Sequence, residues 1–252
     1  MHLKVLTPAL FLLATTTLSA QTADQEVAAG DKAYSALDIP GALDHYKKAI
    51  EIDPKNYAGL WKAARAAMDY GIPASTAERR NALFASAEQY ARRAVAVNPG
   101  DANGHFVLAY ALGKTALTKS ASQRVKYGTA VHDQALTCLR IDPNQAGCLH
   151  VMGVWNAEVM RLNGFTRMIA RNLLGGKVFG SASWSEAERY MTESVANEPN
   201  RIVHHLDLAA IYKDRDNKAK AKTEYQAVLD LPVTDYNDRH YKAEAAAALK
   251  SL

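Results

Sequence analysis

The stretch that decides the fold runs from residue 30 to residue 56 and reads GDKAYSALDIPGALDHYKKAIEIDPKN. Its middle, Asp38-Ile39-Pro40-Gly41, has the composition of a turn between two helices. In the second helix the small residues Ala42 and Ala49 allow close packing on the first helix. Pro54 ends that helix because proline cannot continue the ladder of backbone hydrogen bonds. The stretch therefore predicts a helical hairpin.

The same small-residue and proline spacing returns three more times along the chain, and a fourth time with its proline one residue early. The recurring positions are Ala87, Ala91, Ala94 and Pro99; Val131, Ala135, Cys138 and Pro143; Ala187, Met191, Ser194 and Pro199; and Ala221, Tyr225, Val228 and Pro232. This spacing is typical of the tetratricopeptide repeat (TPR). Five such hairpins predict an all-α fold, a right-handed α-solenoid, with a capping helix over residues 238–252. Gly30 and Gly153 lie where paired helices must cross closely, and Tyr46 fills the gap between helix pairs.

The repeats are longer than usual. Prolines at positions 54, 99, 143 and 199 are 45, 44 and 56 residues apart, whereas a tetratricopeptide unit has about 34 residues. We therefore expect long second helices in hairpins two and three. Hairpin four has about 22 extra residues relative to that unit, the stretch GFTRMIARNLLGGKVFGSASW at 164–184.

This insert predicts a short amphipathic helix with a basic edge, ended by Gly175-Gly176. Its apolar residues follow helical spacing, and two arginines lie four residues apart on another face. Three interpretations stay open: a lid across the groove of the solenoid, a contact with a membrane surface, or a plug on the solenoid's flank. The candidate residues are Phe165, Arg167, Met168, Ile169, Arg171, Leu173, Lys177 and Phe179.

The beginning of the chain predicts export. Residues 1–20 combine a basic start, a short apolar core and a small-residue cleavage site, as in a signal peptide. We expect a periplasmic or secreted protein whose residues 21–252 form a single domain, with no later membrane span. In an oxidising compartment Cys138 and Cys148 could form a disulfide; the alternative is two buried small residues in a helix interface.

Charge is distributed unevenly along the chain. Residues 79–177 contain 13 Lys or Arg and 5 Asp or Glu, whereas residues 21–78 contain 6 and 9, and residues 178–252 contain 10 and 12. The basic middle favours an anionic partner, although a solvated basic face without a ligand explains it equally well.

The chain lacks the motifs of the common enzyme classes. We find no HExxH, GxSxG, glycine-rich phosphate loop or CxxC. The adjacent pair His204-His205 is a poor metal site, because neighbouring residues on a helix point about 100° apart. We therefore expect no catalysis, no cofactor, no metal and no nucleic-acid partner.

A ligand would bind in the concave groove, which the first helix of each hairpin lines. The repeat register gives a mixed aromatic, apolar and basic set: Trp61, Arg65, Met68, Phe106, Tyr110, Lys114, His150 and Val154. Such a surface suits a peptide with acidic and apolar contacts, or an amphiphile with an anionic head. The alternative is that some of these residues belong to the core, and we expect about half to be exposed.

Five blocks give the chain a resemblance to a known family. They are LWKAARAAMDYG (60–71), LHVMGVW (149–155), RMIARNLLGGKVFGSASWSEA (167–187), LAAIYKD (208–214) and LPVTDYNDRHYKAEA (231–245). In their order and spacing the chain resembles the regulator-of-microtubule-dynamics family. The resemblance implies a non-catalytic helical-repeat domain; animal members are linked to microtubules, and one tether at organelle contacts binds and moves phospholipids.

An exported chain would not meet microtubules, so the resemblance carries over the architecture and not that role. The function we expect is binding of a protein or peptide partner in the groove. The alternative is binding or transfer of an anionic phospholipid or similar amphiphile, with a membrane surface as a further partner.

Overall fold

The computed structural model describes residues 22–252, and the expected signal peptide lies outside this range. The described residues form twelve α-helices and one 3-10 helix, and no strand occurs among them. The predicted α-solenoid is confirmed. The helices are α1 (Ala23–Ser35), α2 (Ile39–Ile52), α3 (Tyr57–Gly71), α4 (Ala77–Val97), α5 (Ala102–Ala116), α6 (Ala121–Ile141), α7 (Ala146–Arg161), α8 (Gly164–Asn172), η1 (Lys177–Ser181), α9 (Trp184–Asn197), α10 (Ile202–Asp214), α11 (Lys218–Asp230) and α12 (Asp238–Leu249).

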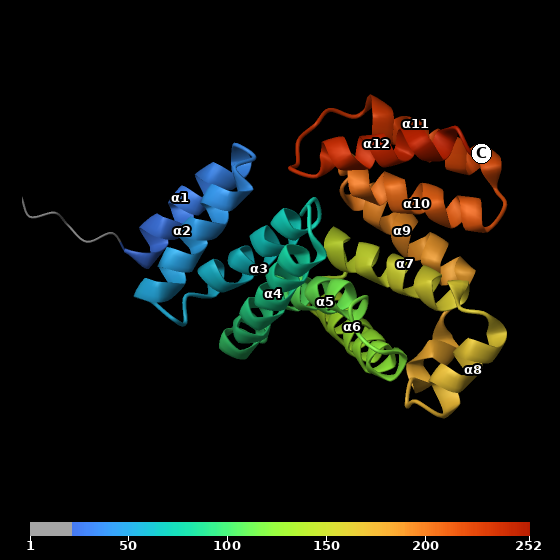
Figure 1. Ribbon diagram of the computed structural model, residues 1–252, viewed down its shortest axis with the longest axis horizontal. Coiled ribbons are helices and arrows are strands. Elements are labelled where there is room, and N and C mark those ends of the chain that lie inside the picture. Colours follow the sequence, from blue (N-terminus) through green and yellow to red (C-terminus); the bar gives the residue numbers. More distant parts are fainter. Residues whose placement is uncertain (1–21) are drawn as a thin grey trace, which may run out of the picture.

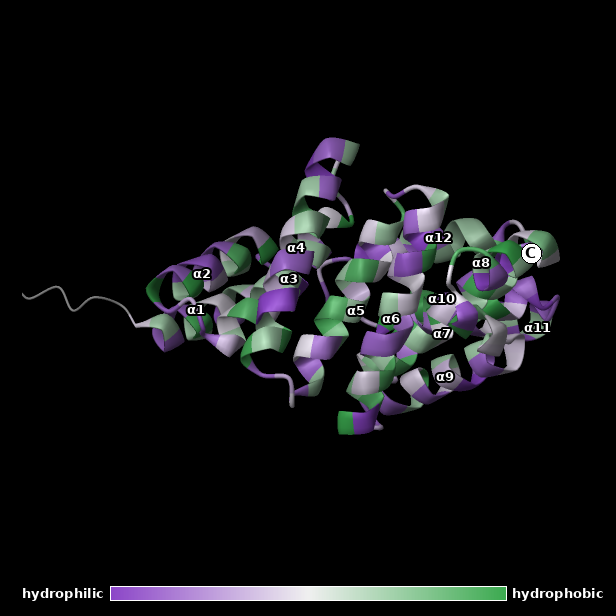
Figure 2. Cartoon of the chain, turned by 90° about the horizontal axis from the view of Figure 1, so that it is seen from below, coloured by the Kyte–Doolittle hydropathy of each residue, from purple (hydrophilic) through white to green (hydrophobic). Residues whose placement is uncertain are grey.

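The five hairpins are α1–α2, α3–α4, α5–α6, α7–α9 and α10–α11, and each stacks on the next (Figure 1). The second helices of hairpins two and three, α4 and α6, have 21 residues each, against 14 in α2 and in α9. This difference accounts for most of the extra length between Pro54 and Pro99 and between Pro99 and Pro143. In Figure 2 green and purple alternate along the helices, as expected when each helix buries one side against its neighbours.

Local sequence explains the ends of these hairpins. In three of them the Asp or Asn before the proline folds back on the turn and accepts a backbone hydrogen bond. The bonds run from Lys55 N to Asp53 (2.9 Å), from Gly100 N to Asn98 (3.2 Å) and from Asn144 N to Asp142 (3.0 Å). Such a side chain holds the chain in a turn after each helix has ended.

Close helix crossings occur at the expected glycines. A Cβ at Gly30 would overlap the ring of Tyr46, and one at Gly153 would lie 3.0 Å from Cε of Met191. Tyr46 is buried, and its hydroxyl donates a hydrogen bond to Asp31 (2.9 Å). Small residues thus fix the distance between α1 and α2, and between α7 and α9.

The stack curves back on itself. Helix α12 packs on α10 and α11, as a capping helix should, but the segment before it reaches across to the second hairpin. In Figure 1 this segment leaves α11 at the upper right and approaches the end of α3. None of the helices among residues 22–252 is long and apolar enough to cross a membrane.

Candidate functional site

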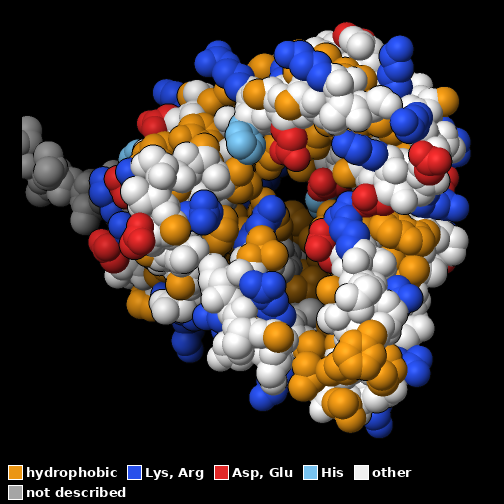
Figure 3. Space-filling model, turned by 45° about the vertical axis from the view of Figure 1, so that its right-hand side comes forward, with side chains coloured by type: hydrophobic (Ala, Val, Ile, Leu, Met, Phe, Trp, Pro, Cys, Tyr) orange, Lys and Arg blue, Asp and Glu red, His pale blue; other side chains and the backbone are white. Residues whose placement is uncertain are grey.

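The middle of the concave face holds a cluster of charged and phenolic side chains. Tyr34 donates a hydrogen bond to the carboxylate of Asp69 (2.5 Å), and the guanidinium of Arg65 stacks on the Tyr34 ring (4.7 Å to its centroid). Arg201 donates to the carboxylate of Asp235 (2.5 Å). Arg65 lies 3.9 Å from the carboxylate of Asp69 and 3.9 Å from that of Asp235, so it connects the Tyr34–Asp69 pair to the Arg201–Asp235 pair. We call these five residues the concave cluster. In Figure 3 basic and acidic side chains lie around a central hollow.

The segment between α11 and α12, residues 231–237, closes the concave face. Asp235 belongs to it, and the amide of Asn237 donates a hydrogen bond to the backbone carbonyl of Asp69 (3.1 Å). Tyr236 packs against the core of the first two hairpins. Asp238, at the start of α12, holds the segment in shape by accepting from the backbone of Thr234 (2.8 Å) and of Asp235 (2.7 Å). The segment therefore connects the fifth hairpin to the second across the concave face.

Burial determines the charge state of this cluster. Burial, and then the nearby charge of Asp235, raise the pKa of Asp69 to about 6, although Arg65 acts in the opposite direction. The pKa of Tyr34 is raised far above its usual value, first by burial and then by Asp69, so its hydroxyl keeps its proton. Asp69 is buried, accepts the hydrogen bond of Tyr34 and has the charges of Arg65 and Arg201 nearby. We interpret this arrangement as a network that holds the structure together.

The predicted groove residues are less accessible than expected. We expected half to be exposed, but seven of the eight are half-buried and Met68 is fully buried. The prediction for Met68 is wrong because α1, α2, α4 and α5 all pack on α3, and Met68 belongs to the core of the first two hairpins. Trp61 and Arg65 do line an open pocket of about 200 Å³, together with Asp31, Tyr34, Ser35, Tyr46 and Lys62.

The other groove residues form a row along α5 and α7. Phe106 lies parallel to Tyr110, with ring centroids 6.1 Å apart, and its ring fills the space beside Gly147. Lys114 lies 5.7 Å from the centroid of the Tyr110 ring. Val154 packs against the core of the last two hairpins. Phe106 thus joins hairpin three to hairpin four, whereas the contacts between Phe106, Tyr110 and Lys114 lie within α5.

His150 is part of a hydrogen-bonded chain. It lies 2.9 Å from buried His204 and 3.1 Å from Asp207, while the other ring nitrogen of His204 lies 3.3 Å from Glu198. Burial is the main cause that lowers the pKa of His204 to about 4. His205 points elsewhere, towards Glu224 (2.7 Å). Among residues 22–252 no three His, Cys, Asp or Glu side chains are grouped to hold a metal ion.

The insert forms α8 and η1, and lies between the two helices of hairpin four as predicted. Gly175 has a positive φ of 80°, which ends the helical stretch. Arg167, Met168, Arg171 and Phe179 line a second pocket, of about 270 Å³, with Met160, Gly164, Gly180 and Ala182. Phe165, Met168 and Leu173 are exposed and Ile169 is half-buried. Lys177, at the first position of η1, is exposed.

Phe179 does not belong to an exposed amphipathic face, so its assignment there is wrong. It is buried, its ring meets that of Trp155 edge-on with centroids 5.8 Å apart, and a Cβ at Gly128 would lie 2.8 Å from it. Trp155 in turn donates to the carbonyl of Gly128 (2.8 Å). Phe179 therefore anchors η1 to α6 and α7, and at this residue the insert behaves as a plug.

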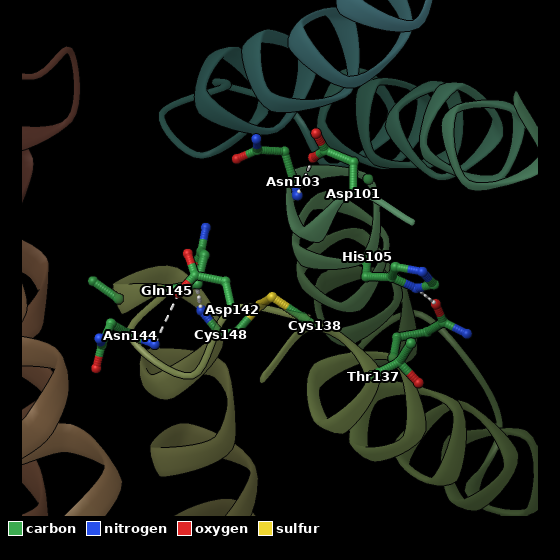
Figure 4. The surroundings of a disulfide bond; sticks show 12 residues. Asp101, Asn103, His105, Thr137, Cys138, Asp142, Asn144, Gln145 and Cys148 are labelled. Carbon is green, nitrogen blue, oxygen red and sulfur yellow. Dashed lines mark hydrogen bonds between the residues drawn. A yellow bond between two sulfur atoms is a disulfide. The ribbon is translucent and has the colours of Figure 1, made fainter. Parts of the chain in front are cut away.

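Cys138 and Cys148 form a disulfide that joins the end of α6 to the first turn of α7. Figure 4 shows the bond beside the turn of Asp142 and Asn144. The side chain of Gln145 caps α7 by accepting from the backbone of Cys148 (2.7 Å). The bond fixes the connection between hairpins three and four.

Sequence reasoning missed the closing contacts of the concave cluster. Asp69, Arg201, Asp235 and Asn237 carry no local pattern, because their partners lie more than 30 residues away in the sequence. One signal was present: blocks 60–71 and 231–245 both belong to the resemblance, and the structure brings these two blocks together.

Comparison with solved structures supports the fold. The structure of TTC0263, a TPR protein of Thermus thermophilus, matches 90% of this chain and 100% of its own, with a TM-score of 0.61 and 19% identity. Pseudomonas aeruginosa pilF matches 91% of this chain and 90% of its own, with a TM-score of 0.52 and 14% identity. At such identities the likeness concerns the fold alone.

Comparison of sequences points to one family. The chain is 24% identical over 195 residues to Regulator of microtubule dynamics protein 1 of Bos taurus, covering 77% of this chain and 61% of the relative. It is 22% identical over 180 residues to Regulator of microtubule dynamics protein 3 of Xenopus laevis, covering 71% and 39%. The chain thus spans about three fifths of the length of the first of these relatives. The family model for Regulator of microtubule dynamics protein 1-3 matches residues 20–252, so the chain belongs to the regulator-of-microtubule-dynamics family.

Proposed function

We propose that the protein is a non-catalytic scaffold that binds a protein or peptide partner at the open, N-terminal part of its concave face. Helical-repeat folds of this kind commonly bind such partners. The observation that carries the proposal is the open pocket around Trp61, which Tyr34 and Arg65 of the concave cluster also line. An aromatic ring, an arginine and a lysine border it, and aromatic and arginine side chains are enriched at the centres of protein interfaces.

The test is capture of partners by the wild-type chain and by Trp61→Ala, followed by calorimetry with the purified partner. We expect Trp61→Ala to weaken binding tenfold or more, an effect of about 1.4 kcal/mol. Ile52→Ala, at an exposed residue at the end of α2 and outside the pocket, is the control and should bind normally. The proposal fails if Trp61→Ala and wild type capture the same proteins with the same affinity.

A second candidate is binding of an anionic phospholipid or a similar amphiphile. The pocket beneath α8 favours it, because Met160, Met168 and Phe179 provide apolar walls while Arg167 and Arg171 provide positive charge. Native mass spectrometry of the protein purified from membranes should then detect a bound lipid, and Arg167→Glu with Arg171→Glu should remove it. A protein that is free of lipid after such a purification would contradict this candidate.

We also propose that the protein is exported to the periplasm or secreted. The sequence of residues 1–20 supports this location, and so does the disulfide, since such bonds persist in oxidising compartments. Cell fractionation and N-terminal sequencing check the proposal. We expect an extracytoplasmic protein that begins near Gln21, and a cytoplasmic protein with an uncleaved start would contradict it.

A further inference from the structure

Helix α8 turns its apolar side towards solvent. Phe165 is 69% exposed, Leu173, which follows its last turn, is 73% exposed, and Met168 is 41% exposed. Eight large hydrophobic side chains are exposed among residues 22–252, and these three fall within nine consecutive residues. A helix on a globular protein ordinarily turns this side towards the core. In α8 only Ala170 is buried, so the packing within this chain leaves the apolar side uncovered.

The charge around this apolar side has one sign. Residues 159–185 contain no Asp or Glu. Arg167 contacts the sulfur of Met160 (3.0 Å) and Arg171 donates to the side chain of Asn172 (3.1 Å). Within the described part of the chain, no carboxylate lies within 4.0 Å of Arg167, Arg171 or Lys177. Their charge is therefore not neutralised by ion pairs.

A second segment with the same character adjoins the insert. A Cβ at Gly176 would lie 2.8 Å from Val125, in the second turn of α6, so the start of α6 lies against the insert. Residues 102–132 contain no Asp or Glu, and Leu117, in the turn between α5 and α6, is 64% exposed. Lys119 and Arg124 lie in or beside that turn. We call α8, Leu173 and the turn 117–120 the tip.

The tip projects from one corner of the molecule. Figure 1 shows α8 at the lower right, beside the near ends of α5 and α6 and away from α12. In Figure 3 hydrophobic side chains gather at the lower right with Lys and Arg around them, and no Asp or Glu is visible there. The exposed apolar side chains project from this corner, and a projecting group of this kind can insert into the surface of a lipid bilayer.

We propose that the tip docks on an anionic lipid bilayer. Phe165, Met168 and Leu173 enter the boundary between head groups and acyl chains, while Arg167, Arg171 and Lys119 contact phosphates. Amphipathic helices with this division of apolar and basic residues lie in the plane of membranes, and each cation near an anionic surface adds to the affinity. Such docking needs neither a partner at Trp61 nor a lipid in the pocket beneath α8.

Sedimentation of the full chain with vesicles tests the proposal. We expect binding to vesicles that contain phosphatidylglycerol, no binding to phosphatidylcholine alone, and release by salt. Arg167→Glu with Arg171→Glu should lower the partition coefficient about tenfold or more. Lys47→Glu with Lys48→Glu, at exposed positions in α2, makes the same change in net charge and should have a much smaller effect.

The apolar contribution is tested with Phe165→Ser and Leu173→Ser, for which Ile52→Ser is the control at an exposed hydrophobic residue far from the tip. We expect loss of vesicle binding with an unchanged thermal unfolding midpoint. The proposal is overturned if wild type ignores anionic vesicles, if both charge reversals weaken binding equally, or if the two serines leave binding unchanged. In the first case a tip that captures an acidic protein would be the remaining interpretation.

Discussion

The side-chain amide of Asn237 donates a 3.1 Å hydrogen bond to the backbone carbonyl of Asp69, 168 residues earlier in the chain. Solenoids usually gain their stability from contacts between neighbouring repeats. Here the segment before α12 reaches from the fifth hairpin to the second. The ion pair of Arg65 with Asp235 and the packing of Tyr236 reinforce the same contact, while the ion pair of Arg201 with Asp235 holds the segment against the start of α10. The curvature of this solenoid is thus fixed by a closure in addition to the angles between repeats.

The first prediction concerns this closure. Asn237→Ala removes the donor to the Asp69 carbonyl, and we expect it to lower the free energy of unfolding by about 1–2 kcal/mol. Hydrogen exchange should increase in residues 231–238 and in α3, and much less in α5 and α6. Asn81→Ala, at an exposed residue of α4, is the control and should change neither quantity. Exchange that rises uniformly along the chain would refute a local closure.

A second prediction concerns the pH dependence of stability. The pKa of Asp69 is about 6 in the folded chain, above its ordinary value of 3.8, so the folded state binds this proton more tightly than the unfolded state. Stability from Asp69 is therefore present at low pH and is lost as the pH rises from about 4 to about 6, by up to about 3 kcal/mol. Asp69→Asn removes this dependence.

The quantity to measure is the difference in unfolding free energy between Asp69→Asn and wild type, from urea titrations at several pH values from about 4 to about 7. We expect the difference to move in favour of Asp69→Asn as the pH rises, whatever constant cost the lost contacts impose. Asp44→Asn, at an exposed residue of α2, should show no comparable trend. If the difference in unfolding free energy stays constant across this pH range, the pKa of Asp69 is not raised in the folded chain.

Local patterns predicted the helices well. Small residues at the crossing positions and a proline after the second helix predict each hairpin. Both signals are local, because each involves residues within one or two helical turns of one another. The lengths of α4 and α6 and the place of α8 follow from the same count of residues between prolines. Gly175-Gly176 was expected to end the inserted helix, and α8 ends at Asn172, just before it.

The site was harder to predict because its residues meet through tertiary contacts. Trp61, Arg65 and Met68 lie on one side of α3, yet only the first two border the open pocket, because the neighbouring helices cover the third. Phe179 follows the amphipathic helix in sequence, but η1 turns it inward onto Trp155. No periodicity in one helix encodes the approach of Asp235 to Arg65 or of Asn237 to Asp69.

A third prediction concerns the disulfide between Cys138 and Cys148. The bond closes a short loop in the unfolded chain, and a loop of this length corresponds to about 2–3 kcal/mol of stabilisation. Cys138→Ser with Cys148→Ser should therefore lower the denaturant midpoint, and reduction of the wild-type protein should lower it by a similar amount. Equal midpoints for the oxidised, reduced and substituted proteins would contradict a structural role for this bond.

The last prediction separates two glycines that look alike in sequence. Gly30 lies in α1 and Gly113 in α5, and alanine has the higher helix propensity at any such position by about 1 kcal/mol. At Gly30 a Cβ would overlap the ring of Tyr46, which is buried and held by its hydrogen bond to Asp31. At Gly113 the nearest atom of another element, Cγ2 of Val131, would lie 3.9 Å away, which is an ordinary contact. We therefore expect Gly30→Ala to destabilise the fold by about 1–3 kcal/mol through overpacking, whereas Gly113→Ala should stabilise it by about 0.5–1 kcal/mol. Thermal unfolding of the two variants beside wild type measures both signs, and stabilisation by Gly30→Ala would contradict a steric requirement for glycine where α1 crosses α2.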